Sequence, residues 1–406
     1  MRTLIYLSTC ATDAKGVPCA FLHHELGWLT EHFDRVLLCG HAGVGWAQAG
    51  QAAIPLAKPL WPRLRAALGA PFSRDVWREW AHLRRDGKLT PVHALKVLVF
   101  AIRGRTLAGW ARPALRAGGA VTVYAFWMSY DAYAAALIKA RHPGVRAVAR
   151  GHAFEIDLAR NPMNPYLMKA KIGEELDGIF PISGDAQARL LACAPMPAGK
   201  VRVLPLGSAG DGIPERWPAP RFAQGALHVV SCASIHRIKQ VPVLIDALAR
   251  WQGGRLEWLH IGGGVDEAAV RAYAAAKLGG RADIQYRITG AITADQVLDF
   301  YAKQPFDVFV NTSSSEGVPV SIMEALRAGL PIIAPAVGGI PELVDDAVGI
   351  LYAPEGGADA VRQALEQIAA QTPEQAQAMR QAAQTRWAER CRNAALLAQL
   401  FPEAQG

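Results

Sequence analysis

The sequence lacks most of the features that mark secreted, metal-dependent and membrane-spanning proteins. Its six cysteines are scattered over 406 residues and form no CxxC pair or His/Cys cluster, which excludes a disulfide-rich scaffold and a cysteine-based zinc site. The longest apolar run, residues 92–102, contains Lys96 and is too short to span a bilayer. The first ten residues lack a cleavage signal and suit a buried strand. We therefore expect a reduced, cytoplasmic chain.

Two cofactor motifs are also missing. The G-x-G-x-x-G fingerprint of dinucleotide folds does not follow the first expected strand, which argues against a nicotinamide oxidoreductase. No D-x-D pair stands at a suitable strand end. A bound diphosphate would therefore be neutralised by lysine, arginine and helix N-termini. We expect no metal and no other cofactor.

Basic residues are concentrated in the first half of the chain. Residues 1–205 carry 26 Lys and Arg against 14 Asp and Glu, whereas residues 206–406 carry 17 against 21. The excess is densest in residues 58–116, which have 13 basic and three acidic side chains. Such asymmetry indicates an anionic partner for one half only.

Short apolar strands alternate with helical segments in both halves. In the first half we expect strands in RTLIYLS, RVLLCG, VTVYAFWM, VRAVARG, GIFPIS and VRVLPLG. In the second half we expect them in LHVVSCAS, RLEWLHIGGG, ADIQYRITG, FDVFVNTS, PIIAPAVGG and VGILYAP. This alternation is typical of doubly wound α/β sheets. It predicts two facing Rossmann-like domains with a ligand cleft between them.

The domain boundaries follow from composition. A Gly- and Pro-rich segment at 208–226 indicates a linker between an N-terminal domain, 1–207, and a C-terminal domain, 227–385. The remaining residues, 386–406, are expected as a terminal helix. The long helical pattern that leads into it has Thr372 as N-cap and Pro373 at its first position.

Two glutamates eight residues apart mark one strand exit of the second half. Glu316 lies in the loop after FDVFVNTS, and Glu324 lies in the helix that follows. Backbone N–H groups of Gly317, Val318 and Val320 would be free there to bind an anion or sugar hydroxyls. Carboxylates at this place can accept hydrogen bonds from vicinal hydroxyls. The alternative for Glu324 is a capping box, because Ser321 precedes it by three residues.

Two other strand exits add a cation and a glycine cluster. Lys239 lies between a strand and a helix N-terminus, which suits a diphosphate; the alternative is a solvated turn lysine. Gly262, Gly263 and Gly264 would let a backbone approach a ligand closely, as a weak dinucleotide signal.

In the first half, two strand exits are candidates for ligand contact. Gly16 lies in the loop after the first strand, and His152 follows RAVARG together with Arg150. A single histidine at such a place can be catalytic or can be structural.

These stretches resemble the retaining glycosyltransferases of family 4, which have the GT-B architecture. The resemblance is strongest over residues 227–355. There SEGVPVSIMEALRAGLPIIAPAVGGIPELV is similar to the family's E-x7-E signature and glycine turn, VSCASIHRIKQVPVLIDAL to its lysine loop, and ITGAI to its base-contacting loop. RGHAFEIDL matches more loosely an Arg-x-His segment of members that build capsular and exopolysaccharides. Trp387 and the helix after it look like the terminal helix that crosses back to the N-domain.

The resemblance implies a role for each candidate residue. It places Glu324 on the nucleotide ribose, Lys239 on the diphosphate and His152 near sugar and acceptor. Glu316, with the N–H groups of residues 317–320, would grip the donor sugar. The donor-binding set is completed by Gly16, Arg237, Gly263, Ile292, Gly317, Val318, Pro319 and Val320.

The implied reaction is hexose transfer from a nucleotide-diphosphate sugar, UDP more than GDP, in bacterial surface polysaccharide synthesis. Many members have an arginine five residues before the lysine, but this chain has Ser234 there. We expect Arg237 to take over part of the phosphate charge. Because of this departure, a non-catalytic nucleotide-sugar-binding subunit of a polysaccharide assembly stays open as an alternative.

The basic stretch at 58–116 then acquires a candidate use. Trp61, Trp77 and Trp80 lie among arginines that include Arg84 and Arg85, and basic helices with tryptophan at their edges bind anionic membrane surfaces. We expect the chain to lie on the inner face of the plasma membrane and to meet a glycan or a polyprenyl-diphosphate-linked acceptor. The alternative is a solvated basic face over a core stripe. Nucleic acid fits less well, because the second half is acidic.

Overall fold

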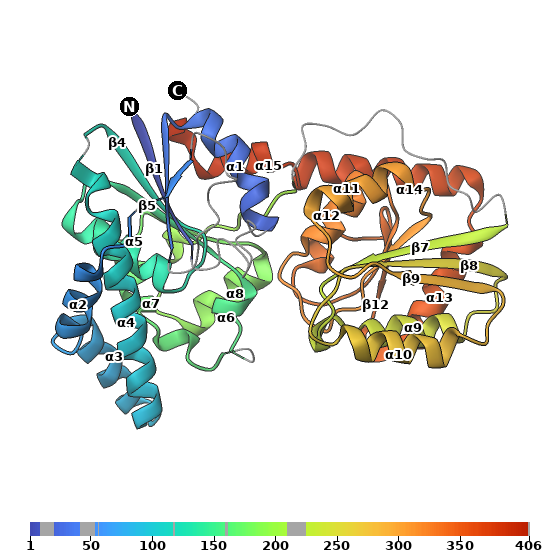
Figure 1. Cartoon of the computed structure of the whole chain (residues 1–406), viewed down its shortest axis with the longest axis horizontal. Helices are drawn as coiled ribbons and strands as arrows, with labels where there is room; N and C mark the ends of the chain where they lie inside the picture. The colour runs from blue at the N-terminus through green and yellow to red at the C-terminus, as the bar shows by residue number, and fades with distance from the viewer. Residues whose placement is uncertain are drawn as a thin grey trace. The chain divides into compact units, whose positions relative to one another are not determined.

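The computed structural model describes residues 1–8, 20–40, 53–55, 57–116, 118–158, 161–208 and 225–404. The chain forms two compact units (Figure 1). Unit 1 consists of Met1–Pro205 and Leu397–Gly406, and unit 2 of Leu206–Leu396. Cys39, Cys193, Cys232 and Cys391 are free thiols. Among the described helices none is long and apolar enough to cross a membrane.

Unit 1 is built on a six-stranded parallel sheet of order β3-β2-β1-β4-β5-β6. Its strands are β1 Arg2–Leu7, β2 Arg35–Cys39, β3 Ala53–Pro55, β4 Ala120–Ala125, β5 Arg146–Gly151 and β6 Gly178–Pro181. β1, β2, β5 and β6 are buried along nearly their whole length, as in sheets covered on both faces. The helices of the unit are α1 Ala20–His32, α2 Leu60–Gly69, α3 Arg74–Arg85, α4 Pro91–Ala111, α5 Tyr130–Arg141, α6 Ala153–Ile156, α7 Lys169–Glu175 and α8 Gly184–Cys193.

Unit 2 has a second six-stranded parallel sheet, of order β12-β11-β10-β7-β8-β9. Its strands are β7 Ala226–Cys232, β8 Arg255–Ile261, β9 Ile284–Ile288, β10 Val308–Val310, β11 Ile332–Pro335 and β12 Gly349–Tyr352. The helices are α9 Val241–Ala249, α10 Glu267–Leu278, α11 Ala294–Lys303, α12 Val320–Arg327, α13 Gly357–Ala369 and α14 Pro373–Arg390. The bulky side chains Trp251 and Trp258 are fully buried in its core.

The two sheets have the same topology. Read in chain order within each unit, both run 3-2-1-4-5-6, the order of the dinucleotide-binding fold. The predicted α/β class with two Rossmann-like sheets is thereby confirmed. In each sheet the strand order reverses between the first and fourth strands, and ligands of this fold bind at the carboxyl ends of the strands at that point. In unit 2 this switch point lies between β7 and β10.

In unit 1 one predicted strand was wrong and one strand was missed. VRVLPLG forms no strand: Val201 makes one isolated bridge to Ile179, and the carbonyls of Leu204 and Pro205 accept from the Arg150 guanidinium. A side chain thus satisfies carbonyls that a sheet neighbour would otherwise pair. The third strand, β3, was not predicted, because its three residues are too few to show alternation.

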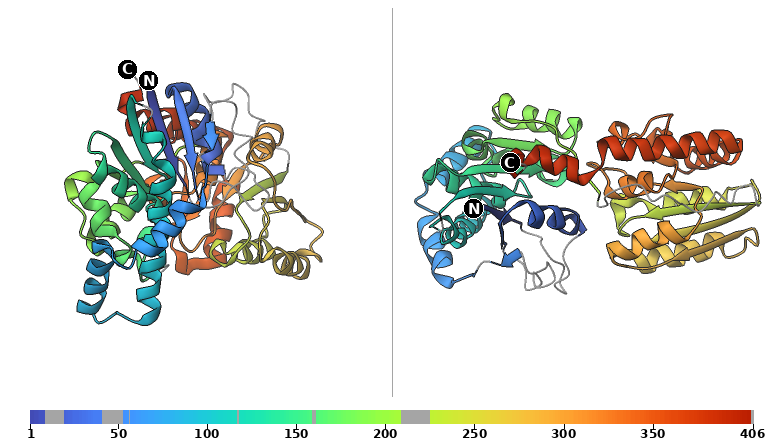
Figure 2. Two further views of the ribbon diagram at one scale, coloured as in Figure 1. Left: turned by 60° about the vertical axis from the view of Figure 1, so that its left-hand side comes forward. Right: turned by 90° about the horizontal axis from the view of Figure 1, so that it is seen from above.

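The C-terminal helical segment is divided in two. Thr372 caps α14 and accepts a hydrogen bond from the Gln375 N–H, with Pro373 at the first position as expected. After α14 ends at Arg390, α15 follows at Asn393–Leu400. The two ends of the chain lie side by side (Figure 2), and Arg2 donates to the carbonyl of Ala404 at 3.0 Å.

Candidate functional site

The switch point of unit 2 brings Lys239 and Glu316 together. Lys239 lies on a 3-10 turn, residues 237–239, between β7 and α9, and Glu316 lies between β10 and α12. The Lys239 Nζ donates to Glu316 Oε1 at 2.6 Å, with both side chains mostly buried. The Thr312 hydroxyl holds the Lys239 turn by donating to the Lys239 and Gln240 carbonyls, at 2.9 and 3.1 Å. Two strand exits are therefore joined by charge and by backbone contacts.

A glycine turn fixes the Glu316 loop from its other side. The Gly339 N–H donates to the Gly317 carbonyl at 2.7 Å. Gly338 has φ +54°, and a Cβ placed there would lie 1.9 Å from the Glu316 carbonyl oxygen. The glycine is required both by this positive φ and by the close approach of the two loops.

The Glu324 capping-box alternative was wrong. Helix α12 begins at Val320 with Pro319 as its N-cap and no capping side chain, so Ser321 lies inside the helix. Glu324 is one turn further along and nearly fully buried. Its charge is close enough to raise the pKa of the Cys232 thiol, in addition to the larger effect of burial. In the described part of the chain, the N–H groups of Gly317, Val318 and Val320 have no backbone acceptor, as predicted for a helix N-terminus.

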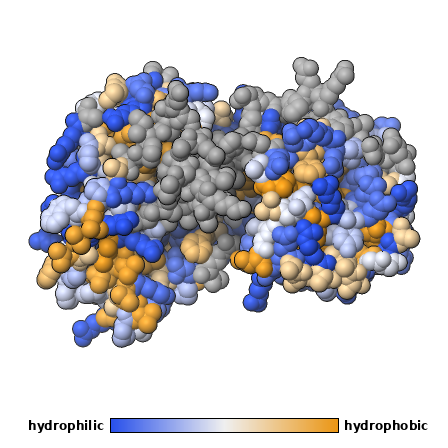
Figure 3. Space-filling model, in the orientation of Figure 1, coloured by the Kyte–Doolittle hydropathy of each residue, from blue (hydrophilic) through white to orange (hydrophobic). Residues whose placement is uncertain are grey.

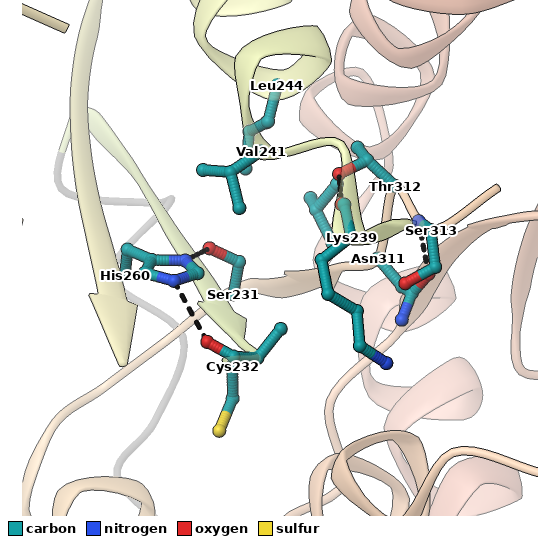
Figure 4. Close-up of a pocket in the computed structure, with 11 residues that line it drawn as sticks. Ser231, Cys232, Lys239, Val241, Leu244, His260, Asn311, Thr312 and Ser313 are labelled. Atoms are coloured by element: carbon teal, nitrogen blue, oxygen red, sulfur yellow. Dashed lines mark hydrogen bonds between the residues drawn. The ribbon is translucent and has the colours of Figure 1, made fainter. Parts of the chain in front are cut away.

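A small pocket, partly open to solvent, lies at the ends of β7, β8 and β10. Figure 4 shows His260 and Lys239 on opposite sides of it. Its polar lining includes Ser231, Asn311, Thr312 and Ser313. The sequence interpretation did not single out these four residues or His260. Their position directly at strand ends was the signal that could have identified them.

His260 is a structural histidine within this pocket. Trp258 donates to the Ser231 hydroxyl at 2.9 Å, Ser231 bonds His260 Nδ1 at 2.8 Å, and His260 Nε2 lies 3.2 Å from the Ala233 carbonyl. A carbonyl only accepts, so Nε2 carries the proton and Nδ1 accepts from Ser231. Burial lowers the pKa of His260 to about 4. The ring is therefore neutral at physiological pH and has both nitrogens bonded.

The three glycines after β8 serve loop packing. Gly262 has φ +137°, and a Cβ there would lie 2.0 Å from the Ala233 carbonyl; at Gly264 it would lie 2.3 Å from the Ile235 carbonyl. Gly263 accepts from the Ile235 N–H at 2.9 Å, and a Cβ on it would lie 2.6 Å from the Ala291 nitrogen. Gly263 thus adjoins the ITGAI loop, where Ile292 is partly buried. At Gly262 and Gly264 the closest contacts are to backbone carbonyls, whereas a Cβ on Gly263 would also lie 2.5 Å from the Glu267 carboxylate.

The remaining donor candidates differ in setting. Arg237 and Ser234 are exposed on the turn before α9. Gly16 lies outside the described residues. Among those described, no group of three or more His, Cys, Asp or Glu side chains is arranged to hold a metal.

In unit 1, His152 lies at the end of β5 and is buried. Its ring lies against those of Phe126 and Trp127 at tilted angles of 36° and 48°, with centroids 4.8 and 4.5 Å away. Neither ring nitrogen has a hydrogen-bond partner in the described part of the chain. Burial, with the Arg150 guanidinium as a smaller cause, lowers the pKa of His152 to about 3. The residue is therefore a neutral imidazole, and its Nδ1 lies 3.8 Å from the buried Glu155 carboxylate, beyond hydrogen-bond distance.

Arg150 itself has a structural position. It is completely buried, donates to the Tyr124 hydroxyl at 2.9 Å and lies 3.5 Å from Glu25. Together with its bonds to the carbonyls of Leu204 and Pro205, these contacts tie β5 to the end of unit 1's first segment.

The predicted membrane residues lie on α2 and α3. Trp61 and Trp77 are 67% and 60% exposed, and Arg84 and Arg85 are exposed as well. Trp80 is partly buried instead, because its Nε1 donates to the Ala94 carbonyl of α4 at 3.1 Å. Trp80 therefore links α3 to α4, and only two of the three predicted membrane tryptophans, Trp61 and Trp77, are exposed.

Comparisons with known proteins agree with this geometry. Residues 226–371 match the family model described as Glycosyl transferases group 1. The amylovoran biosynthesis glycosyltransferase AmsK of Erwinia amylovora is 30% identical over 195 residues, which are 45% of this chain and 45% of AmsK. The chain thus spans about half the length of that curated relative.

Solved structures match over the whole chain. HepE of Anabaena in complex with UDP superposes with a TM-score of 0.69 at 17% identity, covering 100% of both chains. The lipopolysaccharide outer core galactosyltransferase WaaB superposes with a TM-score of 0.67 at 14% identity, covering 100% of this chain and 99% of WaaB. The chain therefore has the fold of the GT-B glycosyltransferases HepE and WaaB, and its residues 226–371 match the group 1 glycosyl transferases.

Proposed function

We propose that this protein is a retaining, metal-independent glycosyltransferase. It moves a hexose from UDP-sugar to a lipid-linked or growing glycan in surface polysaccharide synthesis. The observation that carries the proposal is the pairing of Lys239 with Glu316 at the switch point of unit 2, together with Glu324 in helix α12, which follows the Glu316 loop. A cation, an acid and a buried second acid at one strand edge match the three parts of a nucleotide-diphosphate sugar.

Each group has a defined task in this proposal. Lys239 neutralises the diphosphate as the bond from the anomeric carbon to its oxygen breaks. Glu316 and the N–H groups of residues 317–320 hold the sugar hydroxyls, and Glu324 holds the ribose. The acceptor oxygen bonds to the anomeric carbon on the face that UDP leaves, and its proton passes to the leaving diphosphate. His152, which is neutral and makes no hydrogen bond through its ring nitrogens to the described residues, serves the sugar and acceptor by hydrogen bonding.

The similar proteins support the choice of a UDP-sugar donor and of polysaccharide synthesis. HepE has been solved with UDP and with UDP-glucose, which favours UDP over GDP, and AmsK acts in amylovoran biosynthesis. The same proposal includes peripheral association with the inner face of the plasma membrane, where a lipid-linked acceptor is available.

The test begins with melting-shift titration of the full chain with UDP, GDP and ADP. UDP should raise the melting temperature most. UDP-glucose is then incubated with and without a lipid-linked glycan acceptor, and released UDP is measured. Acceptor-dependent release supports the transferase, whereas UDP binding without any release supports the scaffolding subunit. Absence of binding by all three nucleotides would reject both.

A further inference from the structure

Exposed apolar side chains of this chain gather on one part of unit 1. Figure 3 shows a hydrophobic surface where Figure 1 draws α2, α3 and α4. Ten of the 15 large hydrophobic side chains that are exposed in the described residues lie between 60 and 99: Leu60, Trp61, Leu64, Leu68, Phe72, Trp77, Leu89, Val92, Leu95 and Val99. Such a concentration on a single face marks an interaction surface.

The spacing of these residues defines an outer helix face. On α2, Leu60, Leu64 and Leu68 follow each other at four-residue intervals, and their exposures are 63, 45 and 73%. Phe72 follows α2 and is 84% exposed. The inner faces are already occupied, since Ala66 of α2 and Val97 of α4 are buried. The outer stripe is therefore additional to what the fold of unit 1 needs.

The net charge of residues 58–116 is more positive than a count of their charged side chains suggests. Of the three acids in residues 58–116, Glu79 alone is buried, whereas Asp75 is half-buried and Asp86 is exposed. Asp75 and Asp86 accept hydrogen bonds from Tyr133 and Tyr166, each at 2.7 Å. Glu79 is 2% exposed, and burial raises its pKa to about 8, so it is mostly protonated at neutral pH. The arginines, by contrast, remain largely at the surface, Arg63, Arg65, Arg74, Arg84 and Arg85 among them.

Apolar and aromatic side chains interleaved with exposed arginines match the interface of an anionic bilayer. The apolar groups enter the acyl boundary while the guanidinium groups meet lipid phosphates. A second copy of this chain fits less well, because a two-fold contact through this face would set arginines against arginines. We propose that the outer face of α2, α3 and α4 docks on an anionic phospholipid surface, with Leu64, Leu68 and Phe72 entering it.

This inference deepens the proposed function, because a lipid-linked acceptor is presented at such a surface. Vesicle binding is measured without donor or acceptor. A negative result in this test can therefore be distinguished from a failure to bind UDP. The full chain is sedimented with phosphatidylcholine vesicles that contain about a third phosphatidylglycerol, and with pure phosphatidylcholine vesicles. The variants are Leu68→Ser/Phe72→Ser and Arg84→Glu/Arg85→Glu. Val265→Ser is the matched control, since Val265 is 91% exposed on unit 2.

We expect the wild type and Val265→Ser to sediment with the anionic vesicles only. Both double variants should bind the anionic vesicles at least about tenfold more weakly than wild type. One removes apolar side chains that would enter the bilayer, and the other removes arginines that would contact lipid phosphates. Circular dichroism checks that the variants remain folded. Wild-type protein that stays in the supernatant, or a Leu68→Ser/Phe72→Ser variant that binds like wild type, would overturn the proposal. So would a wild-type dimer that this variant dissociates, because the face would then bind protein.

Discussion

The Lys239 Nζ lies 2.6 Å from Glu316 Oε1, although the two residues are 77 positions apart in the chain. The pair joins the exits of β7 and β10, the two strands that flank the switch point of unit 2. In the proposed function the diphosphate competes with Glu316 for the lysine, and the sugar competes with the lysine for Glu316. Donor binding therefore exchanges one ion pair for two ligand contacts.

This exchange predicts opposite effects for the two partners. Lys239→Met should weaken UDP binding about 10- to 100-fold, because a charge-assisted bond to the diphosphate is lost. Glu316→Gln should bind UDP at least as tightly as wild type, since the lysine is released. The ratio of UDP-glucose to UDP affinity should nevertheless fall about tenfold. Calorimetry measures both, with exposed Glu355→Gln as the control. Equal losses of UDP and UDP-glucose affinity in Glu316→Gln would contradict this assignment.

Ribose recognition by Glu324 is testable with a ligand that lacks one hydroxyl. Wild type should bind UDP about tenfold more tightly than 2′-deoxy-UDP, because a buried carboxylate left without its donor is costly. In Glu324→Ala the two ligands should bind equally. A preference for UDP that survives the substitution would place the ribose elsewhere.

Arg237 is expected to supply the phosphate charge missing at Ser234. Arg237→Ala should raise the UDP dissociation constant about three- to tenfold, as for an exposed cation that contacts a phosphate. Arg255→Ala is the control, because Arg255 is exposed at the amino end of β8, the opposite edge of the sheet. An unchanged affinity in Arg237→Ala would remove this residue from the site.

The low pKa of His152 makes stability depend on pH in a defined direction. Between pH 6.5 and about 3 the unfolded chain holds a proton on this histidine that the folded chain lacks. The free energy of unfolding should therefore fall as pH falls through this window, by at most about 1.4 kcal/mol per unit. Urea unfolding of wild type and His152→Gln between pH 4 and 7 should show a smaller slope for the variant. Exposed His142→Gln should keep the wild-type slope.

Gly338 should be intolerant of any side chain. Gly338→Ala requires a left-handed φ and displaces the Glu316 loop, which should cost about 1–3 kcal/mol and weaken UDP-glucose binding. Gly280→Ala is the control, because a Cβ at Gly280 meets nothing within 4 Å. Thermal unfolding and calorimetry give the two readouts. Equal melting temperatures of the two variants would contradict the packing argument.

Strand–helix alternation predicted both sheets, because buried parallel strands appear as short apolar runs bounded by Gly or Pro. β3 was not predicted because three residues are too few to show an alternating pattern. VRVLPLG was wrongly predicted as a strand because the carbonyls of an apolar segment can also bond to a buried arginine. Segment patterns contain no information on which side chain will satisfy a given carbonyl.

The site was predictable in part for a related reason. Lys239, Glu316 and Glu324 stand at strand exits, so their edge of the sheet follows from topology. The Ser231–His260 chain was not predictable, because a hydrogen bond between neighbouring strands depends on register. Likewise, the glycines after β8 suggested a ligand, whereas Gly262 and Gly264 pack against carbonyls of the β7–α9 loop.

The last turn of the chain has a consequence for biosynthesis. Glu403 accepts from Thr122 and Arg146, and Phe401 packs against Phe33 and Tyr124, so residues 397–404 complete the packing of unit 1. Unit 2 lies between the two pieces of unit 1 in the chain. During translation, unit 1 therefore cannot be completed until residues 397–404 have been made, after the whole of unit 2. Until then Tyr124 lacks its contact with Phe401.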